Sequence, residues 1–278
     1  MTVATLAQVL QPALKQGYAV AGLVTLGWED IIAYVAAAEA EKQPLILQAG
    51  PGCREHTPVP VLGEMFRYVS EQASVPVVAH LDHGYTLEEC RQGIDSGFTS
   101  VMFDGSRKPL QQNIDETAAI AELAHAATVS CEGEIGFVGY AEGEASNGTD
   151  PSEAERFARE TQVDAMAVSV GNVHLQQQKS SGLDLQRIHD IESVTDVPLV
   201  IHGGSGVPAE QRLALANSTA ICKYNIGTEL RMAFGSALRE AVNRDRERFD
   251  RNAILKETID PLTETTRLVL RSMGYPSP

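Results

Sequence analysis

Residues 77–84 read VVAHLDHG, an apolar run that ends in three titratable side chains, His80, Asp82 and His83. An apolar run of this length is typical of a strand that is buried on both faces, as in a parallel sheet. Seven similar runs occur along the chain, separated by longer amphipathic stretches, which is the pattern of repeated βα units. The eight runs are YAVAGLV (18–24), PLILQAG (44–50), VPVVAHLDHG (75–84), FTSVMFDGS (98–106), TVSCEGEIG (128–136), AMAVSVGNV (165–173), VPLVIHGGSG (197–206) and AICKYNIGT (220–228).

Eight such runs without a Pro-rich or low-complexity linker favour a closed (β/α)8 TIM barrel, of the α/β class, over an open doubly wound sheet. We expect residues 1–278 to form a single barrel domain, with a helical C-terminal extension from about residue 229. In the helix candidate TLEECRQGIDSG (86–97), Thr86 is placed to cap and Glu89 to complete a capping box. The acidic segment 137–155, rich in small residues, predicts a mobile loop.

The composition excludes several classes of partner. The net charge is −15 and the pI is about 4.9, which opposes nucleic-acid or anionic-membrane binding because both need a basic face. No apolar stretch approaches the roughly 20 residues of a membrane span, and the N-terminus lacks the basic and apolar regions of a signal peptide. We therefore expect a cytoplasmic protein. The cysteines lie far apart without a CxxC pair, which predicts reduced, buried thiols at Cys53, Cys90, Cys131 and Cys222.

Titratable residues gather at the predicted strand ends, and four of the seven histidines lie at three of them. A single histidine there is more often a hydrogen-bonded core residue, but three separate strand ends favour a shared role. The carboxyl ends of barrel strands meet on one face, so His83, His174 and His202 could bind one Zn²⁺. Three protein ligands leave a position open for substrate. Glu134 or Asp104 is expected nearby, as an alternate ligand or as a carboxylate that holds a histidine ring.

Two glycine-bearing segments predict a phosphate site. Gly203, Gly204 and Ser205 lie at the end of the seventh run, and Gly227 and Thr228 lie at the end of the eighth. Barrels commonly bind phosphate on the backbone N–H groups of these two loops, which needs no net positive charge.

Lys223 offers a different chemistry. It shares a strand face with Asn225 and could point into the barrel as the nucleophile of a Schiff-base aldolase. In that case the histidines would have no task, and a lysine inside a barrel can instead pair with Glu132 or Asp104. We expect the metal-dependent chemistry.

The motifs together resemble the class II, metal-dependent fructose-bisphosphate and tagatose-bisphosphate aldolases. The resemblance runs from about residue 18 to 235 and rests on HLDHG (80–84), GFTSVMFDGS (97–106), CEGEIG (131–136), GNVH (171–174), IHGGSG (201–206) and KYNIGTELR (223–231). It implies a (β/α)8 barrel, one zinc ion per subunit bound by the three histidines, and reversible cleavage of a ketose phosphate to dihydroxyacetone phosphate, or a close relative, and an aldehyde. It also implies an oligomer, a dimer or tetramer.

The resemblance also implies roles for individual residues. Asp82 would exchange the hydroxyl proton, Glu142 on the loop after the fifth strand would return a proton to carbon, and Asn225 would stabilise the enediolate. The substrate phosphate would lie on the two glycine loops, with Leu175 and Asn225 beside it and a monovalent cation, Na⁺ or K⁺, close by.

Three positions depart from the family pattern. Gly22-Leu23-Val24 replaces the usual Ala-Phe-Asn, Ala49 replaces a serine, and Leu175 replaces a glycine. The first two changes remove polar groups where the aldehyde half binds, so they leave open whether the substrate is a mono- or bisphosphate. Another zinc-dependent barrel lyase or sugar-phosphate epimerase, or a non-catalytic sugar-phosphate-binding subunit, remains an alternative.

Overall fold

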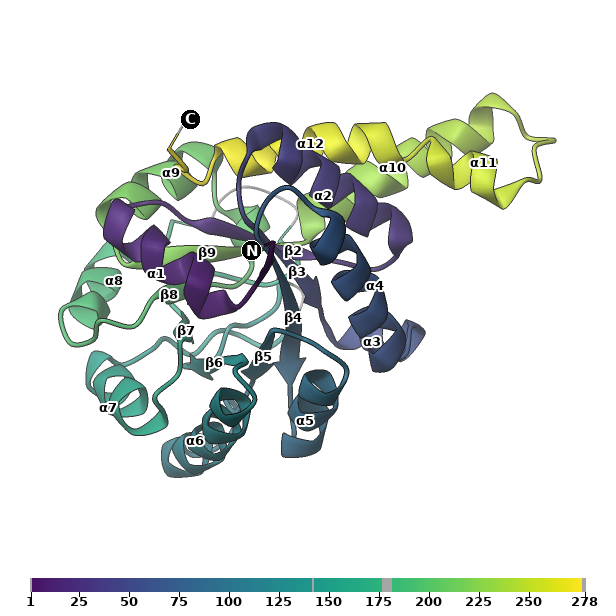
Figure 1. Ribbon diagram of the computed structural model, residues 1–278. Coiled ribbons are helices and arrows are strands. Elements are labelled where there is room, and N and C mark those ends of the chain that lie inside the picture. Colours follow the sequence, from purple (N-terminus) through teal and green to yellow (C-terminus); the bar gives the residue numbers. More distant parts are fainter. Residues whose placement is uncertain (1, 142, 177–181, 277–278) are drawn as a thin grey trace.

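The computed structural model describes residues 2–141, 143–176 and 182–276. The strands form one parallel sheet in the order β1-β4-β3-β2-β9-β8-β7-β6-β5, and an additional pairing of β4 with β5 closes eight of them into a barrel (Figure 1). The strands are β1 (Val3–Ala4), β2 (Val20–Val24), β3 (Leu45–Ala49), β4 (Val77–Gly84), β5 (Ser100–Phe103), β6 (Ser130–Ile135), β7 (Ala165–Val168), β8 (Leu199–Ile201) and β9 (Ile221–Ile226). Each of the eight apolar runs contains one barrel strand, which confirms the (β/α)8 prediction.

Most of the helices surround the barrel on its outer side (Figure 1). They are α1 (Leu6–Gln16), α2 (Trp28–Glu41), α3 (Pro51–His56), α4 (Val59–Gln72), α5 (Leu87–Asp95), α6 (Leu110–Ala126), α7 (Pro151–Thr161), α8 (Leu185–Glu192), α9 (Ala209–Ser218), α10 (Thr228–Arg244), α11 (Arg251–Lys256) and α12 (Ile259–Arg271), with a 3₁₀ turn, η1 (Gly204–Gly206). The predicted cap of α5 is present, because the Thr86 hydroxyl accepts a hydrogen bond from the N–H of Glu89 at 3.1 Å. The Glu89 carboxylate instead accepts from the N–H of Tyr85, one residue before the cap.

Helix α1 closes the amino-terminal end of the barrel, a feature that the strand pattern did not predict. Thr5 caps this helix in a capping box with Gln8, and the buried side of the helix packs on inward-facing residues of the barrel strands, among them Val78 and Met102. Figure 1 shows α1 lying across this end of the barrel. The amino-terminal end is therefore covered, and a cavity over the barrel axis must lie at the carboxyl ends of the strands.

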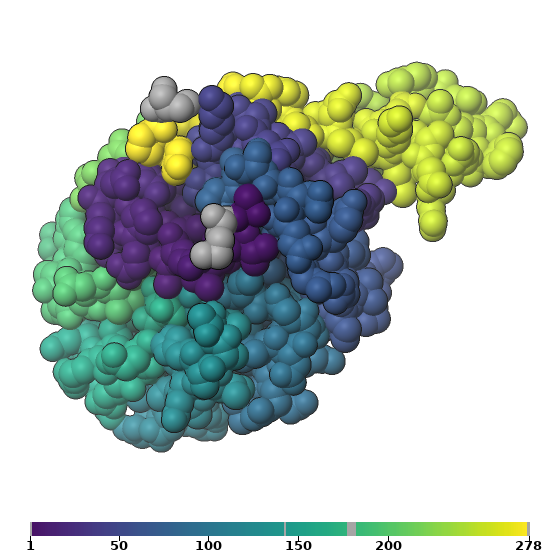
Figure 2. All heavy atoms as spheres, in the orientation of Figure 1, coloured from purple at the N-terminus to yellow at the C-terminus, as the bar shows by residue number. Residues whose placement is uncertain are grey.

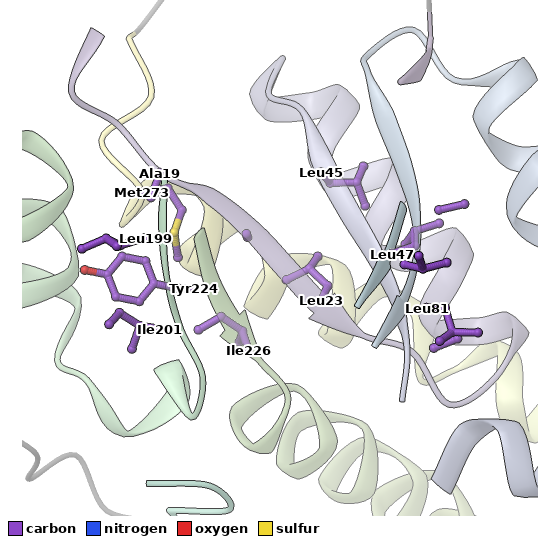
Figure 3. Close-up of a cluster of buried hydrophobic side chains, with 14 of the residues drawn as sticks. Ala19, Leu23, Leu45, Leu47, Leu81, Leu199, Ile201, Tyr224, Ile226 and Met273 are labelled. Atoms are coloured by element: carbon purple, nitrogen blue, oxygen red, sulfur yellow. The ribbon is translucent and has the colours of Figure 1, made fainter. Parts of the chain in front are cut away.

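The larger hydrophobic core lies between the strands and the surrounding helices. Figure 3 shows part of it, where Leu23, Leu47 and Leu81 of neighbouring strands lie close to one another. Such residues are fully buried, which is the burial that near-continuous apolar strands require. The four cysteines are free and buried, as the spacing predicted. Within the described part of the chain, the helices are too short or too polar to cross a membrane.

The C-terminal helices leave and rejoin the barrel. Figure 2 shows α10 and α11 projecting from the body as an arm, and α12 returns to pack on α2. Two ion pairs join α12 to α2, because Arg267 and Arg271 of α12 both pair with the carboxylate of Glu41 on α2. Phe249, between α10 and α11, is 95% exposed.

Candidate active site

The end of β4 separates its three titratable side chains into two groups. His80 is completely buried, and its Nδ1 lies 2.8 Å from the hydroxyl of Ser100 on β5. Asp82 and His83 line an open cavity at the carboxyl end of the barrel. His83 has a φ of 51°, in the left-handed region that non-glycine residues rarely adopt, where the pairing of β4 with β5 becomes irregular. The strand therefore supplies one buried histidine and two residues to the cavity.

The three predicted metal ligands converge at this cavity. His83 comes from β4, His174 from the segment after β7, and His202 directly from the end of β8. The ring centroid of His83 lies 4.7 Å from that of His202 and 5.5 Å from that of His174, and the remaining pair is 5.6 Å apart. One ligand nitrogen from each ring lies within 4.8 Å of the other two. Three imidazoles in this arrangement match the donor set of a catalytic zinc site.

Carboxylates lie next to the rings of His83 and His202. His83 Nδ1 lies 2.9 Å from Asp104 Oδ2, and His202 Nε2 lies 3.2 Å from Glu132 Oε1. His202 Nδ1 has no hydrogen-bond partner among the described residues, although Glu134 Oε2 lies 3.3 Å away. Metal-binding histidines are commonly oriented in this way. The residues present therefore fit a divalent metal ion, and His83, Asp104 and Glu134 form a second group that could bind one.

Burial and neighbouring charges set the protonation of these groups. Burial lowers the pKa of His202, but the carboxylates of Glu134 and Glu132 outweigh this effect and raise the pKa to about 10. Burial, together with the two neighbouring imidazoles, lowers the pKa of His174 to about 3. His174 is therefore a neutral imidazole, the form that binds metals.

Asp82 lies at the bottom of the cavity, only 5% exposed. Its Oδ1 accepts a hydrogen bond from Asn225 Nδ2 at 3.3 Å. Burial raises the pKa of Asp82, but the positive charges of His83 and Lys223 outweigh burial, and the net shift is downward. Asp82 is thus an ionised carboxylate that can accept a proton.

Lys223 is inside the barrel, as its strand face predicted, but it does not line the cavity. It is fully buried, its Nζ lies 2.6 Å from Glu132 Oε2, and His80 Nε2 is 3.5 Å away. An amine that is paired in this way and separated from the cavity is poorly placed to attack a substrate carbonyl. The geometry disfavours the Schiff-base alternative.

The two glycine loops lie side by side at the cavity. Gly203 has a φ of 65°, and a Cβ there would lie 2.1 Å from the carbonyl oxygen of Val173, so only glycine fits. The hydroxyl of Ser205 accepts hydrogen bonds from the N–H groups of Gly227 and Glu229 at 3.2 and 3.4 Å and ties the loops together.

Six of the seven predicted phosphate-site residues line the cavity, and Gly204 is the exception. The six are Leu175, Gly203, Ser205, Asn225, Gly227 and Thr228. Gly204 is buried in η1. Leu175 has a φ of 57° and is 52% exposed. Glycine adopts this left-handed backbone without strain, which explains why the family pattern has glycine at this position. Leu175 keeps the same backbone conformation at some cost in strain.

Two residues at the site, Arg54 and Tyr140, were not predicted from the sequence. Arg54 of α3 donates hydrogen bonds to the backbone carbonyls of Ala49, Asp82 and His83, at 2.6, 2.5 and 2.9 Å. It therefore holds the end of β4 in place. The ring of Tyr140 stacks on His174 with the centroids 5.0 Å apart.

Glu142, the predicted proton donor, lies outside the described residues. Tyr140, two residues earlier in the chain, lines the cavity and forms an isolated bridge with His174.

The cavity has a volume of about 320 Å³. The imidazoles and the glycine loops form part of its lining. Apolar or small residues form another part, namely Val24, Leu26, Gly50, Pro51, Gly52 and Cys53, and Val24 also lies next to Gly227. Arg231, in the first turn of α10, completes the lining.

A parallel (β/α)8 barrel with three convergent histidines beside an ionised carboxylate defines a class of metal-dependent barrel enzymes. The family model described as "Fructose-bisphosphate aldolase class-II" matches residues 4–275. The chain is 35% identical to a fructose-bisphosphate aldolase of Geobacillus stearothermophilus, over 99% of this chain and 98% of that protein. It is also 35% identical to a 6-phospho-5-dehydro-2-deoxy-D-gluconate aldolase of Shouchella clausii, over 97% and 94% of the two chains. The crystal structure of the YdjI aldolase from Escherichia coli K12 superimposes with a TM-score of 0.85 at 28% identity, covering 98% of this chain and 97% of that one.

The chain therefore belongs to the class II fructose-bisphosphate aldolase family. It is an aldolase, a carbon–carbon lyase that cleaves ketose phosphates. This result favours the aldolase over the epimerase and the non-catalytic subunit that the sequence left open.

Proposed function

We propose that the protein reversibly cleaves a ketose phosphate to dihydroxyacetone phosphate, or a close relative, and an aldehyde, with Zn²⁺ bound by His83, His174 and His202. The observation that carries this proposal is the convergence of three imidazole nitrogens beside the ionised carboxylate of Asp82. Zn²⁺ in this position would polarise the substrate carbonyl as a Lewis acid. Glu134 and Asp104 orient the histidines, and Glu134 is close enough to serve as an alternate ligand.

The residues of the chain supply the proton transfers. Asp82 accepts the proton of the hydroxyl group on the carbon that becomes the aldehyde, and the adjacent carbon–carbon bond breaks. The electron pair of that bond remains on the dihydroxyacetone phosphate half as an enediolate, toward which Asn225 donates its amide N–H. Glu142 then delivers a proton to the carbon, which completes the product.

We propose that the substrate phosphate lies on the two glycine loops, at the cavity-lining residues Gly203, Ser205, Gly227 and Thr228, while Gly204 forms the buried turn between Gly203 and Ser205. Leu175 contributes its backbone beside them, and a monovalent cation, Na⁺ or K⁺, would lie close by. A backbone site of this kind suits a protein with a net charge of −15.

The second end of the substrate is the part in which relatives differ. One group is named for fructose bisphosphate and another for 6-phospho-5-dehydro-2-deoxy-D-gluconate, a phosphorylated sugar acid. We propose a substrate of the same general kind, with a phosphate on the dihydroxyacetone half and a further substituent on the aldehyde half. The apolar Val24 and Ala49 stand where the family pattern has polar groups, so we expect the aldehyde half to differ from that of fructose bisphosphate.

We further propose that the enzyme acts in the cytoplasm as a homo-oligomer, a dimer or tetramer. The projecting α10–α11 arm, with Phe249 exposed, supports an intersubunit contact. Sedimentation equilibrium of the intact protein would show a monomer if this proposal is wrong.

A screen of ketose mono- and bisphosphates, with added Zn²⁺ or Co²⁺, would test the activity through release of dihydroxyacetone phosphate. We expect EDTA to abolish turnover and zinc to restore it. Full activity in a preparation free of transition metal would refute the metal-dependent mechanism. Glu142→Gln should slow exchange of the carbon-bound proton of dihydroxyacetone phosphate into heavy water, and undiminished exchange would assign that step to another group.

A further inference from the structure

Arg231 is a cation that lines the active-site cavity but has no role in the reaction proposed above. It lies in the first turn of α10, three residues after Thr228, and its side chain is exposed. Among the described residues that line the cavity, it is the sole arginine or lysine. It also lines a neighbouring cavity of about 300 Å³, which shares Leu26 with the first. Arg231 thus stands in the wall between the two cavities.

The guanidinium of Arg231 makes no hydrogen bond or ion pair within the part of the chain that the structure describes. Asp30, which lines the neighbouring cavity with Arg231, is already engaged, because its Oδ2 accepts hydrogen bonds from the backbone N–H groups of Leu26 and Gly27 at 2.7 and 3.1 Å. By contrast, Arg267 and Arg271 of the same C-terminal extension both pair with Glu41. A permanent charge that forms no ion pair with the described residues, at the edge of a substrate cavity, is available to a substrate anion.

The backbone of Arg231 adjoins the phosphate loop at Gly227, but its side chain lines the neighbouring cavity together with Leu26. The charge of Arg231 acts on Cys53 and Asp30, which belong to the cavity wall formed by the segments after β3 and β2. These segments follow Val24 and Ala49, the positions at which the family resemblance places the aldehyde half of the substrate. Arg231 therefore faces the side on which the aldehyde half of the substrate lies.

The rest of this wall indicates which anion fits. A guanidinium presents two parallel N–H groups that match the two oxygens of a carboxylate. A phosphate dianion has a third charged oxygen that needs further donors, and the neighbouring side chains of Val24, Leu26, Pro51 and Cys53 offer none beyond a thiol. One arginine in an apolar wall is therefore suited to a carboxylate.

We propose that Arg231 determines specificity by binding a carboxylate at the far end of the aldehyde half, so that the enzyme acts on a ketose phosphate that is also a sugar acid. This inference rests on the aldolase function proposed above.

The test uses condensation of dihydroxyacetone phosphate with aldehydes, catalysed by the zinc-loaded enzyme. Aldehyde acids of three to six carbons are compared with neutral aldoses of the same length. Glyceraldehyde 3-phosphate is tested in parallel as a phosphorylated aldehyde. We expect kcat/KM to favour the acid over its matched aldose by roughly 10- to 100-fold at one or more lengths. In Arg231→Met this preference should disappear, and Arg231→Lys should restore part of it. Arg239→Met, which changes an exposed arginine of α10 that lines neither cavity, should keep the full preference.

Three results would overturn the inference. The first is an enzyme that condenses neutral aldoses and aldehyde acids equally well at every length. The second is an Arg231-dependent preference for glyceraldehyde 3-phosphate over the acids, which would assign the site to phosphate. The third concerns the KM for dihydroxyacetone phosphate, measured in the proton-exchange assay of Arg231→Met. A rise in this KM as large as the fall in kcat/KM for the acid would show that Arg231 binds dihydroxyacetone phosphate and not the aldehyde. An enzyme that neither exchanges this proton nor condenses any aldehyde would instead refute the proposed aldolase reaction.

Discussion

Replacing Lys223 with methionine should destabilise the protein strongly. Lys223 and Glu132 are both completely buried, and their charged atoms lie 2.6 Å apart. Methionine retains the shape of the lysine chain but removes the ammonium group, so the Glu132 carboxylate would remain in the barrel without its cationic partner. Removal of one partner from a buried ion pair costs about 3–5 kcal/mol, and we expect a loss of this size in the free energy of unfolding.

The double variant Lys223→Met/Glu132→Gln provides the second measurement. It removes both charges, and replacement of a buried pair by neutral groups is often close to neutral for stability. We expect the double variant to recover most of the loss, apart from about 1 kcal/mol for the hydrogen bond between Glu132 and His202. Recovery of this kind would show that the cost arises from the uncompensated carboxylate and not from the shape of the side chain.

Equilibrium urea unfolding, followed by circular dichroism in EDTA, measures these differences. Lys256→Met serves as a matched control on an exposed lysine of α11, and it should change stability by no more than about 0.5 kcal/mol. If Lys223→Met behaves like this control, the buried ion pair is not an important contribution to stability. Borohydride added with substrate should leave the wild type active, and inactivation would restore Lys223 as a Schiff-base nucleophile.

Three further predictions concern the site and the surface. Asp82→Asn should retain metal binding, measured by elemental analysis, but lose cleavage by about two to four orders of magnitude; a near-normal rate would remove Asp82 from its role as base. Leu175→Gly should raise the free energy of unfolding by about 0.5–1 kcal/mol, because glycine adopts a φ of 57° without strain. Gln162→Gly, at a φ of 56° on the C-cap of α7, is the backbone control, and a destabilised Leu175→Gly beside a stabilised control would contradict the strain argument. Hydrogen bonds from two arginines of α12 lower the pKa of Glu41, so its contribution of about 0.5–1 kcal/mol should be present at pH 7 and decline as the pH falls below about 4. Urea unfolding of wild type and Glu41→Gln at pH 7 and 3.5 measures this contribution, and an equal difference at both values would exclude it.

The sequence alone determined the barrel and most of the site. Apolar runs of strand length report burial on both faces, and their alternation with amphipathic stretches reports the βα repeat, because both patterns are local properties of the chain. A parallel barrel brings the carboxyl ends of all its strands to one rim. The positions of His83, His174 and His202 at three strand ends were therefore sufficient to predict that they meet.

The tertiary structure decided which groups are paired and which are free. Lys223 and Glu132 are 91 residues apart, and Arg54 contacts the carbonyl of a residue 28 positions away. No pattern in the local sequence predicts the buried ion pair or the hydrogen bonds from Arg54 to the end of β4, because each depends on how separate segments pack. The same reason applies to α1, whose apolar face covers the end of the barrel, and to Arg231, which forms no ion pair with the residues that the structure describes. Local periodicity encodes the elements, whereas the charge state and availability of a side chain depend on neighbours that only the folded chain brings together.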